Sequence, residues 1–182
     1  MAESSLLRIG QFDVLSSCLE IPLETVKIAF EIANNYGALT VLNASPFTKE
    51  CLTIIPLTDF LIVNEHELKE MCDVGIDQLE NLRRELSTLN VKHIVITLGS
   101  EGALYIDVTK IELTTIRMLA PTIKAIDTTG CEDAFAGALA GEIASGASMQ
   151  EALQLAIKAG SYAATGFGAQ SSYGTRSEIL KF

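Results

Sequence analysis

Short apolar segments alternate with longer amphipathic ones along much of the chain, and this alternation most constrains its fold. Residues 12–17, 38–44, 59–64 and 93–99 read as buried strands, whereas residues 21–37 and 77–90 carry helical periodicity. Strands that alternate with helices of this length indicate βαβ units and a mostly parallel sheet. The sequence therefore predicts an α/β protein, a three-layer α/β/α fold with a mainly parallel central sheet.

The later part of the chain departs from that alternation. After a turn at Gly99–Gly102, residues 103–108 lie close enough to the preceding strand to pair with it as a hairpin, and residues 109–119 read as edge strands. Two helices, over 132–146 and 148–165, lead into a glycine-rich loop and a short final helix. No linker, internal repeat or low-complexity segment interrupts this order, so we expect residues 1–182 to form a single domain.

The amino-acid composition limits the kinds of molecule that the protein is expected to bind. The net charge of −10 argues against nucleic acid, because few cations are available to neutralise phosphates. The longest apolar runs are too short to cross a bilayer, and the N-terminus shows no signal-peptide pattern. The four cysteines lack metal-ligand spacing and are predicted to be reduced core thiols. We expect a cytoplasmic protein with no membrane or nucleic-acid partner, and the nucleus is the alternative compartment.

Polar residues follow the predicted strands where ligands of parallel sheets bind. Such ligands gather beyond the carboxyl ends of the strands. Five sets of residues lie there: Glu20, Asn43, Asn64, Thr97–Gly102 and Asp127. Their shared position predicts one binding site at this edge of the sheet.

The segment "DTTGCED", residues 127–133, is the strongest candidate for chemistry. Gly130 begins a helix, so the amides of residues 130–133 are expected to have no partner in a preceding turn, and the helix dipole favours an anion there. Asp133 in the first helical turn is placed to accept a proton from an attacking hydroxyl. The alternative is helix capping by Thr129 or Asp127, which the local pattern by itself favours.

The other segments also have simple structural explanations. Asn64 and Glu67 alone are typical of a helix N-cap and a surface acid. Residues 97–102 alone indicate a tight hairpin turn, and residues 166–172 alone indicate a loop. Only the ordered set of segments supports a functional interpretation.

That ordered set resembles the ribokinase family of sugar kinases, the phosphofructokinase-B group. "DTTGCEDAFAG" is similar to the second family signature, D-T-T-G-A-G-D-x-F-x-G. The segments "LEIPLETVKIA", "LNASP", "VNEHE", "VITLGSEGALYID" and "GAQSSYGTRSEI" resemble further family segments in the same order. The resemblance covers nearly the whole chain, and its nearest branch is ribokinase.

The resemblance implies a role for each matching position. Asp133 is implied as the general base, and Gly130, Cys131 and Glu132 as amide donors to the transferring phosphoryl group. Asn64 and Glu67 are implied to orient the phosphates and the water shell of Mg²⁺. The implied ATP site as a whole consists of Asn64, Glu67, Thr97, Leu98, Gly99, Ser100, Glu101, Gly102, Glu132, Asp133 and Ile157. The implied site for a monovalent cation, K⁺, consists of Asp127, Thr129, Ala163, Gly166, Gly168 and Ser172. Glu20 and Asp133 are implied to contact the sugar.

The implied reaction is ATP-dependent phosphorylation of a pentose, D-ribose to D-ribose 5-phosphate. The chain departs from the family pattern at three positions. Cys18 replaces a glutamine, Ile157 an asparagine that contacts the nucleotide, and Glu132 a glycine of the anion site. A Glu132 carboxylate about 4 Å from a phosphate charge would cost on the order of 4 kcal/mol in repulsion at an effective dielectric constant near 20.

The chain is also expected to match only the C-terminal part of the family fold. The N-terminal strands, the lid and the first family signature would precede the matching segments. The alternative function is therefore a catalytically silent nucleotide-binding or interaction module. An exposed sheet edge in such a module could pair with a second copy, giving a homo-oligomer, or with a full-length subunit.

Overall fold

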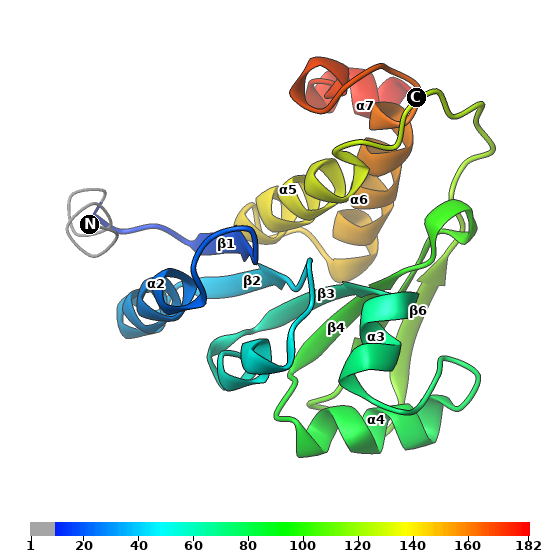
Figure 1. Cartoon of the computed structure of the whole chain (residues 1–182). Helices are drawn as coiled ribbons and strands as arrows, with labels where there is room; N and C mark the ends of the chain where they lie inside the picture. The colour runs from blue at the N-terminus through cyan, green and yellow to red at the C-terminus, as the bar shows by residue number, and fades with distance from the viewer. Residues whose placement is uncertain (1–9) are drawn as a thin grey trace. The chain divides into compact units, whose positions relative to one another are not determined.

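A computed structural model, drawn in Figure 1, describes residues 10–182. These residues divide into two compact units. The first unit contains the residues up to Thr97 together with Leu104–Ile116. The second contains Leu98–Ala103 and Arg117–Phe182. The strands are β1 (Val14–Cys18), β2 (Leu39–Asn43), β3 (Phe60–Asn64), β4 (His93–Thr97), β5 (Ala103–Asp107) and β6 (Thr114–Met118). The α-helices are α2 (Leu23–Tyr36), α3 (Glu65–Met71), α4 (Leu79–Thr88), α5 (Cys131–Ala144), α6 (Met149–Ala163) and α7 (Arg176–Lys181).

The strands form one sheet in the order β1-β2-β3-β4-β5-β6. The first four are parallel, with Val41 opposite Phe60 and Leu61 opposite Ile94. The connection between β4 and β5 is too short for a parallel crossover, so these neighbours form the predicted hairpin. β6 forms one edge, whereas residues 109–113 are a loop and not part of the expected edge strands. The predicted α/β class and mainly parallel sheet are confirmed.

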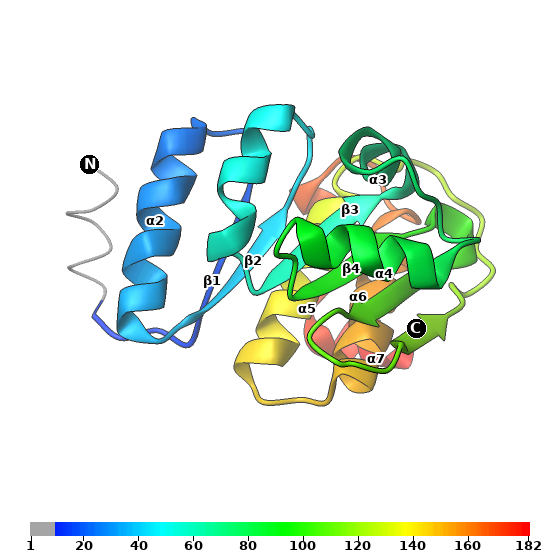
Figure 2. The ribbon, with the colours of Figure 1, turned by 90° about the horizontal axis from the view of Figure 1, so that it is seen from below.

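Helices α2, α3 and α4 lie on the same side of the sheet (Figure 2). This follows from the strand order, because successive right-handed crossovers that advance in one direction place their helices on one face. The apolar stripe of α2 is fully buried at Val26, Phe30 and Ala33. The helix ends as predicted at Gly37, whose φ of 73° is in the left-handed region that favours glycine.

The second unit is built on α5, α6 and α7. Leu155, Ala159 and Ile179 form a core between α6 and α7. Arg176 of α7 donates two hydrogen bonds to the buried carboxylate of Glu142 in α5, at 2.7 and 3.2 Å. This two-point pairing is the strong form of an arginine–carboxylate contact, and it fixes α7 against α5.

All four cysteines are free, as predicted, and Cys51 and Cys72 are buried in the first unit. Cys18 and Cys131 are only half-buried, so the prediction of core thiols is wrong for these two. Burial raises the pKa of Cys51 and of Cys72 to about 11. Both thiols are therefore protonated and unreactive near neutral pH. In residues 10–182, every helix is too short or too polar to span a membrane.

His93, at the start of β4, lies in a polar and aromatic cluster of the first unit. Its ring stacks on Phe60 with centroids 4.7 Å apart, and its Nδ1 lies 2.9 Å from the Tyr105 hydroxyl. The Asp107 carboxylate is 3.5 Å from Nδ1. Burial lowers the pKa of His93 below its ordinary value of 6.5, although the charges of Asp107 and Asp59 oppose this effect.

We expect His93 to make the protein less stable in mild acid. Because its pKa is lower in the folded state, the unfolded chain binds the proton first as the pH falls through 6.5. The free energy of unfolding should therefore decrease with falling pH and level off below the folded-state pKa. Urea unfolding between pH 5 and 8 measures this slope, which His93→Gln should reduce. His66→Gln is the matched control, because the other histidine is exposed. Equal slopes in the wild type and His93→Gln would contradict the prediction.

Candidate active site

The start of α5 is organised by Asp127. Gly130 is the N-cap residue, with a φ of 76°, and no side chain caps it. Asp127 Oδ1 instead accepts hydrogen bonds from the Thr129 amide at 3.0 Å and the Thr129 hydroxyl at 2.7 Å. Its Oδ2 accepts one from the Gly168 amide at 2.9 Å. The alternative of capping by Thr129 or Asp127 is therefore wrong.

These three hydrogen-bond donors also stabilise the ionised form of Asp127. They lower its pKa, the Thr129 amide most and then the Thr129 hydroxyl and the Gly168 amide. The carboxylate is thus ionised at neutral pH and holds the loop before α5 to the loop after α6. Ile126 strengthens this link, because its amide donates to the Ala164 carbonyl at 2.7 Å.

The sequence predicts that the first amides of α5 have no partner in a preceding turn, and one of them does have such a partner. The Cys131 amide donates to the Thr128 carbonyl at 3.2 Å, so the expectation that it has no partner is wrong. The reason is the tight turn through Thr128 and Gly130, which brings that carbonyl back to the helix start. Glu132 and Asp133 follow in the first turn, and both are exposed. The positive end of the helix dipole is therefore exposed next to two acids.

Tyr173 lies beside the start of α5, which the sequence did not indicate. Burial, together with the negative charge of Asp133, raises the pKa of Tyr173. A Cβ atom at Gly130 would lie 2.5 Å from the Tyr173 hydroxyl. The only signal in the sequence was that Tyr173 directly follows Ser172 in the segment "GAQSSYG".

The predicted cation-binding residues fall into two directly connected groups. Asp127, Thr129 and Gly168 form the first. In the second, the Gly166 amide donates to the Ala163 carbonyl at 3.1 Å, and a Cβ at Gly166 would lie 2.7 Å from the Ser172 Cβ. The Ser172 hydroxyl donates to the Ala169 carbonyl at 2.7 Å.

One carboxylate and several loop carbonyls give a set of oxygen donors. Such a set fits a hard cation better than a transition metal. Across residues 10–182, no cluster of three or more His, Cys, Asp or Glu side chains is arranged to hold a metal ion. A cation at this loop would therefore depend on backbone carbonyls together with Asp127.

Asn64 and Glu67 lie in the first unit and form a capping box at the start of α3. Asn64 Oδ1 accepts from the His66 and Glu67 amides, and Glu67 Oε2 accepts from the Asn64 amide at 2.9 Å. The N-cap interpretation of Asn64 is confirmed. The interpretation of Glu67 as a surface acid is wrong, because this residue is only 6% exposed. The hydrogen bond that its carboxylate accepts from the Asn64 amide turns the Glu67 side chain inward.

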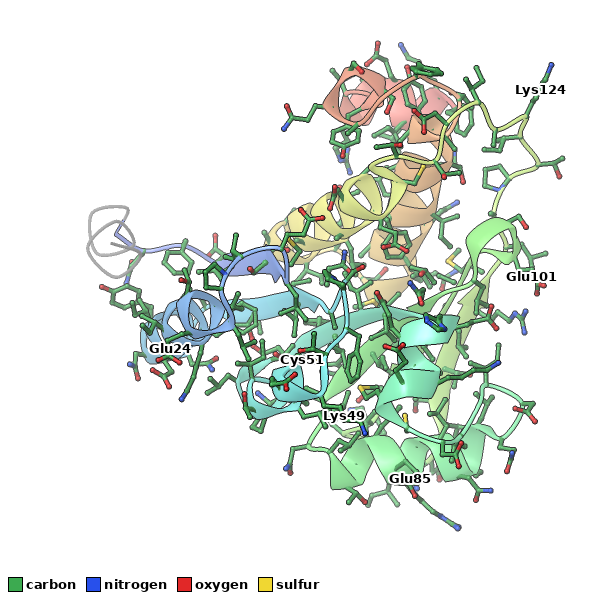
Figure 3. All side chains as sticks on the ribbon, viewed as in Figure 1. Glu24, Lys49, Cys51, Glu85, Glu101 and Lys124 are labelled. Carbon is green, nitrogen blue, oxygen red and sulfur yellow. The ribbon has the colours of Figure 1, made fainter. Side chains whose placement is uncertain are left out.

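Residues 97–102 form the turn between β4 and β5. The Leu98 amide donates to the Gly102 carbonyl at 2.9 Å, and Thr97 Oγ1 lies 3.5 Å from the Val63 carbonyl. Glu101, labelled in Figure 3, pairs with Arg117 at 3.0 Å. Ser100 is exposed on the same turn.

The two glycines of this turn have different structural reasons. Gly102 has a φ of 94°, and a Cβ there would overlap the Met118 carbonyl oxygen and crowd Ala120. The chain's own backbone thus accounts for this glycine. A Cβ at Gly99 would meet no atom within 4 Å, so only its φ of 56° favours glycine. The turn therefore has free space for a side chain at Gly99 but not at Gly102.

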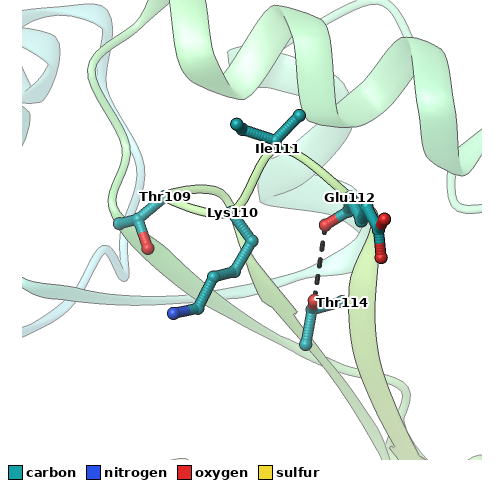
Figure 4. A pocket seen from close by; sticks show the side chains of 5 residues that line it. All are labelled: Thr109, Lys110, Ile111, Glu112 and Thr114. Atoms are coloured by element: carbon teal, nitrogen blue, oxygen red, sulfur yellow. Dashed lines mark hydrogen bonds between the residues drawn. The ribbon is translucent and has the colours of Figure 1, made fainter.

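Two other predicted residues lie away from these contacts. Glu20 is exposed two residues after the end of β1, and Ile157 is buried in α6. A hollow in the loop between β5 and β6 is lined by Thr109, Lys110, Ile111, Glu112 and Thr114, as Figure 4 shows. All five residues that line the hollow are exposed, and none of them is a predicted site residue.

Known proteins give an independent comparison. Ribokinase from Schizosaccharomyces pombe is 31% identical over 178 residues, covering 94% of this chain and 55% of that protein. Deoxyribokinase from Salmonella typhi is 30% identical over 159 residues, covering 85% and 51%. The structure of Arabidopsis thaliana ribokinase complexed with ribose and ATP superposes with a TM-score of 0.79 at 25% identity, covering 92% and 55%.

The predicted ribokinase-like α/β fold is therefore confirmed. The chain spans about half the length of the curated relatives it matches. The model of the pfkB family carbohydrate kinases matches residues 1–176, which is nearly the whole sequence. This chain belongs to the pfkB family of carbohydrate kinases.

Proposed function

We propose that the protein containing this chain transfers the γ-phosphoryl group of ATP to a hydroxyl of a pentose, with D-ribose as the preferred substrate. One observation carries the proposal: an exposed acid, Asp133, lies in the first turn of a helix whose N-terminus is oriented for an anion. The family match supports a sugar as the acceptor. The ribokinase relatives favour ribose as the acceptor, and the deoxyribokinase relative indicates deoxyribose as the main competing substrate.

In the proposed mechanism, Asp133 takes the proton of the sugar hydroxyl as the sugar oxygen forms its bond to phosphorus. The bond between the γ-phosphorus and its bridging oxygen breaks, and ADP leaves. The N-terminus of α5 stabilises charge on the transferring group through its dipole and outward amides. Since the Cys131 amide already donates to Thr128, its contribution requires that this 3.2 Å bond opens.

Two cations complete the proposal. Mg²⁺ bound to ATP would neutralise phosphate charge, and Asn64 and Glu67 would orient its water shell. The capping box suits such an indirect role, because it holds both side chains in fixed orientations. A K⁺ ion at the loop of Asp127, Thr129, Ala163, Gly166, Gly168 and Ser172 would add positive charge near the start of α5.

The departure at Glu132 does not argue against this chemistry. Its side chain is exposed, so the carboxylate can be hydrated and its repulsion of a phosphate is screened. We also propose that the protein is cytoplasmic, because ATP and free sugars are both present in that compartment.

A panel of acceptors tests the proposal. ATP consumption should be measured with ribose, 2-deoxyribose, fructose and adenosine, using the purified chain and the longer protein if one contains it. We expect kcat/KM for ribose to exceed the others by about tenfold, because one well-placed hydroxyl contact is worth that much discrimination. A higher value for another acceptor would contradict the assignment of ribose. No turnover with any acceptor would contradict the kinase activity.

A second candidate is a catalytically silent module that binds nucleotide and pairs through its sheet edge with another copy or a longer subunit. The bonded Cys131 amide and the apolar Ile157 favour it. Calorimetry that detects ATP binding without turnover, together with sedimentation that detects a dimer, would support this candidate.

A further inference from the structure

Asn43, the last residue of β2, has a buried side chain without a hydrogen-bond partner in the protein. The residue is only 6% exposed, and its side-chain amide makes no hydrogen bond to any group in residues 10–182. Within the same residues, Arg83 Nε is the only side-chain nitrogen or oxygen that is both fully enclosed and without a hydrogen bond, so a small ligand can still reach the Asn43 amide. A buried amide that lacks a partner lowers the stability of a fold. Folding alone therefore favours an apolar residue at this position.

The sheet holds Asn43 in place between two neighbouring strands. Its partner in β1 is Cys18, and its partner in β3 is Ile62. Side chains alternate between the two faces of a sheet, so Asn43 shares its face with Ile62 and with Asn64, two residues further along β3. The usual spacings of about 4.8 Å between strands and about 6.6 Å per two residues place the Cβ atoms of Asn43 and Asn64 about 8 Å apart. The two asparagines therefore lie on one face at the carboxyl edge of the sheet, close enough to contact the same small group.

The chemistry of the neighbours favours a phosphate as that group. An asparagine amide has two N–H donors and one carbonyl acceptor, and it carries no charge. Phosphate oxygens accept hydrogen bonds from such donors, whereas water molecules around Mg²⁺ donate to a carbonyl oxygen. Cys18, on the other side of Asn43, behaves as a small apolar residue. The polar partners of a ligand at Asn43 therefore lie toward Asn64, the residue that the proposed function assigns to the phosphates.

We propose that Asn43 is a ligand-binding residue of the ATP site, whose amide donates a hydrogen bond to a phosphate oxygen and accepts one from the water shell of the bound Mg²⁺. The inference rests on the proposed function, in which Asn64 and Glu67 orient the same groups. It adds a residue of β2 to a site that otherwise consists of residues from the end of β3 onward. The ligand supplies the partner that the fold does not, so Asn43 serves affinity and not stability.

The first test needs no ligand. Asn43→Leu has nearly the same shape but no amide, so its melting temperature should equal or exceed that of the wild type. Asn34→Leu is the matched control, because the Asn34 side chain donates to the Leu57 carbonyl at 3.1 Å. Loss of that bond should lower the melting temperature by about 2 to 4 °C. A larger decrease in Asn43→Leu than in Asn34→Leu would show that the fold itself uses the amide, and would overturn the proposal.

The second test measures binding to the full chain by calorimetry. The probe is Mg²⁺ with an ATP analogue whose β,γ-bridge is an imido group, so that turnover plays no part. Asn43→Leu and Asn43→Ala should both raise the Kd of this probe about tenfold, as expected for one hydrogen bond to a charged group. Asn34→Leu should leave it within about twofold of the wild-type value. The Kd for ribose should stay the same in every variant.

The outcomes separate this inference from the proposed function. Unchanged affinity for the probe in Asn43→Ala overturns the inference, and so does a wild-type chain that does not bind the probe. Weaker binding of ribose alone would assign the amide to the acceptor, which also contradicts a phosphate contact. A chain that binds the probe through Asn43 but turns over no sugar contradicts the proposed function and leaves Asn43 as a nucleotide-binding residue.

Discussion

Replacing Asp133 with asparagine should reduce turnover by about two to four orders of magnitude, the range that positioned general bases contribute. Asparagine has nearly the same shape but cannot take the proton of the acceptor hydroxyl. ATP binding should change by no more than about twofold, because the α5 dipole and its amides remain. Steady-state kinetics with ribose and calorimetry with ATP measure the two effects separately.

Glu24→Gln is the matched control for this substitution. Glu24 is also an exposed acid in the first turn of a helix, α2, and Figure 3 labels it. Its replacement should leave kcat unchanged. If Asp133→Asn retained the wild-type rate, Asp133 would serve only the stability of α5, and the proposed mechanism would be wrong.

Replacing Gly102 with alanine should lower the free energy of unfolding by about 3 to 4 kcal/mol, since strain and overlap add at this position. The added Cβ would overlap the Met118 carbonyl oxygen and press on the backbone of Leu119 and Ala120. Its backbone, at φ 94° and ψ −127°, is a conformation that residues with a side chain rarely adopt. Because the three nearest atoms all belong to the backbone, relief requires the chain to shift. Urea unfolding measures the loss.

Gly137→Ala gives the contrasting result. Gly137 lies inside α5, and an added Cβ would meet no atom within 4 Å. Alanine there should stabilise the helix by up to about 1 kcal/mol. A loss of stability at Gly102 no larger than the change at Gly137 would show that the turn accommodates a side chain, contrary to the geometry.

Local patterns in the sequence predicted the structural features that depend only on residues close together along the chain. The buried stripe of α2 and its end at Gly37 follow from periodicity and from glycine's left-handed conformation. The start of α5 at Gly130 was predicted for the same kind of reason. The inward position of Glu67 was missed, although spacing from Asn64 allowed a capping box, because burial depends on the surrounding fold.

Contacts between distant segments could not be predicted in this way. No periodicity relates Asp127 to the Gly168 amide or Gly130 to the Tyr173 hydroxyl. Both depend on how the loop after α6 returns to α5. The resemblance to a family brought Asp127 and Gly168 into one expected site, but it assigned nothing to Tyr173. The position of its hydroxyl beside Gly130 is seen only in the structure.

The Asp127–Gly168 bond joins residues that are 41 positions apart, and Arg176 makes two hydrogen bonds to Glu142 of α5 from the last part of the chain. The segment after α6 thus supplies groups that hold α5 at both ends, Gly168 before its first turn and Arg176 near its last, without belonging to it. Proteolysis or frameshift after α6 would spare the strands of the first unit yet remove the Gly168 donor, the Tyr173 hydroxyl and the Arg176 clamp together. Loss of the segment after α6 should therefore reduce activity at the start of α5 before it disrupts the sheet.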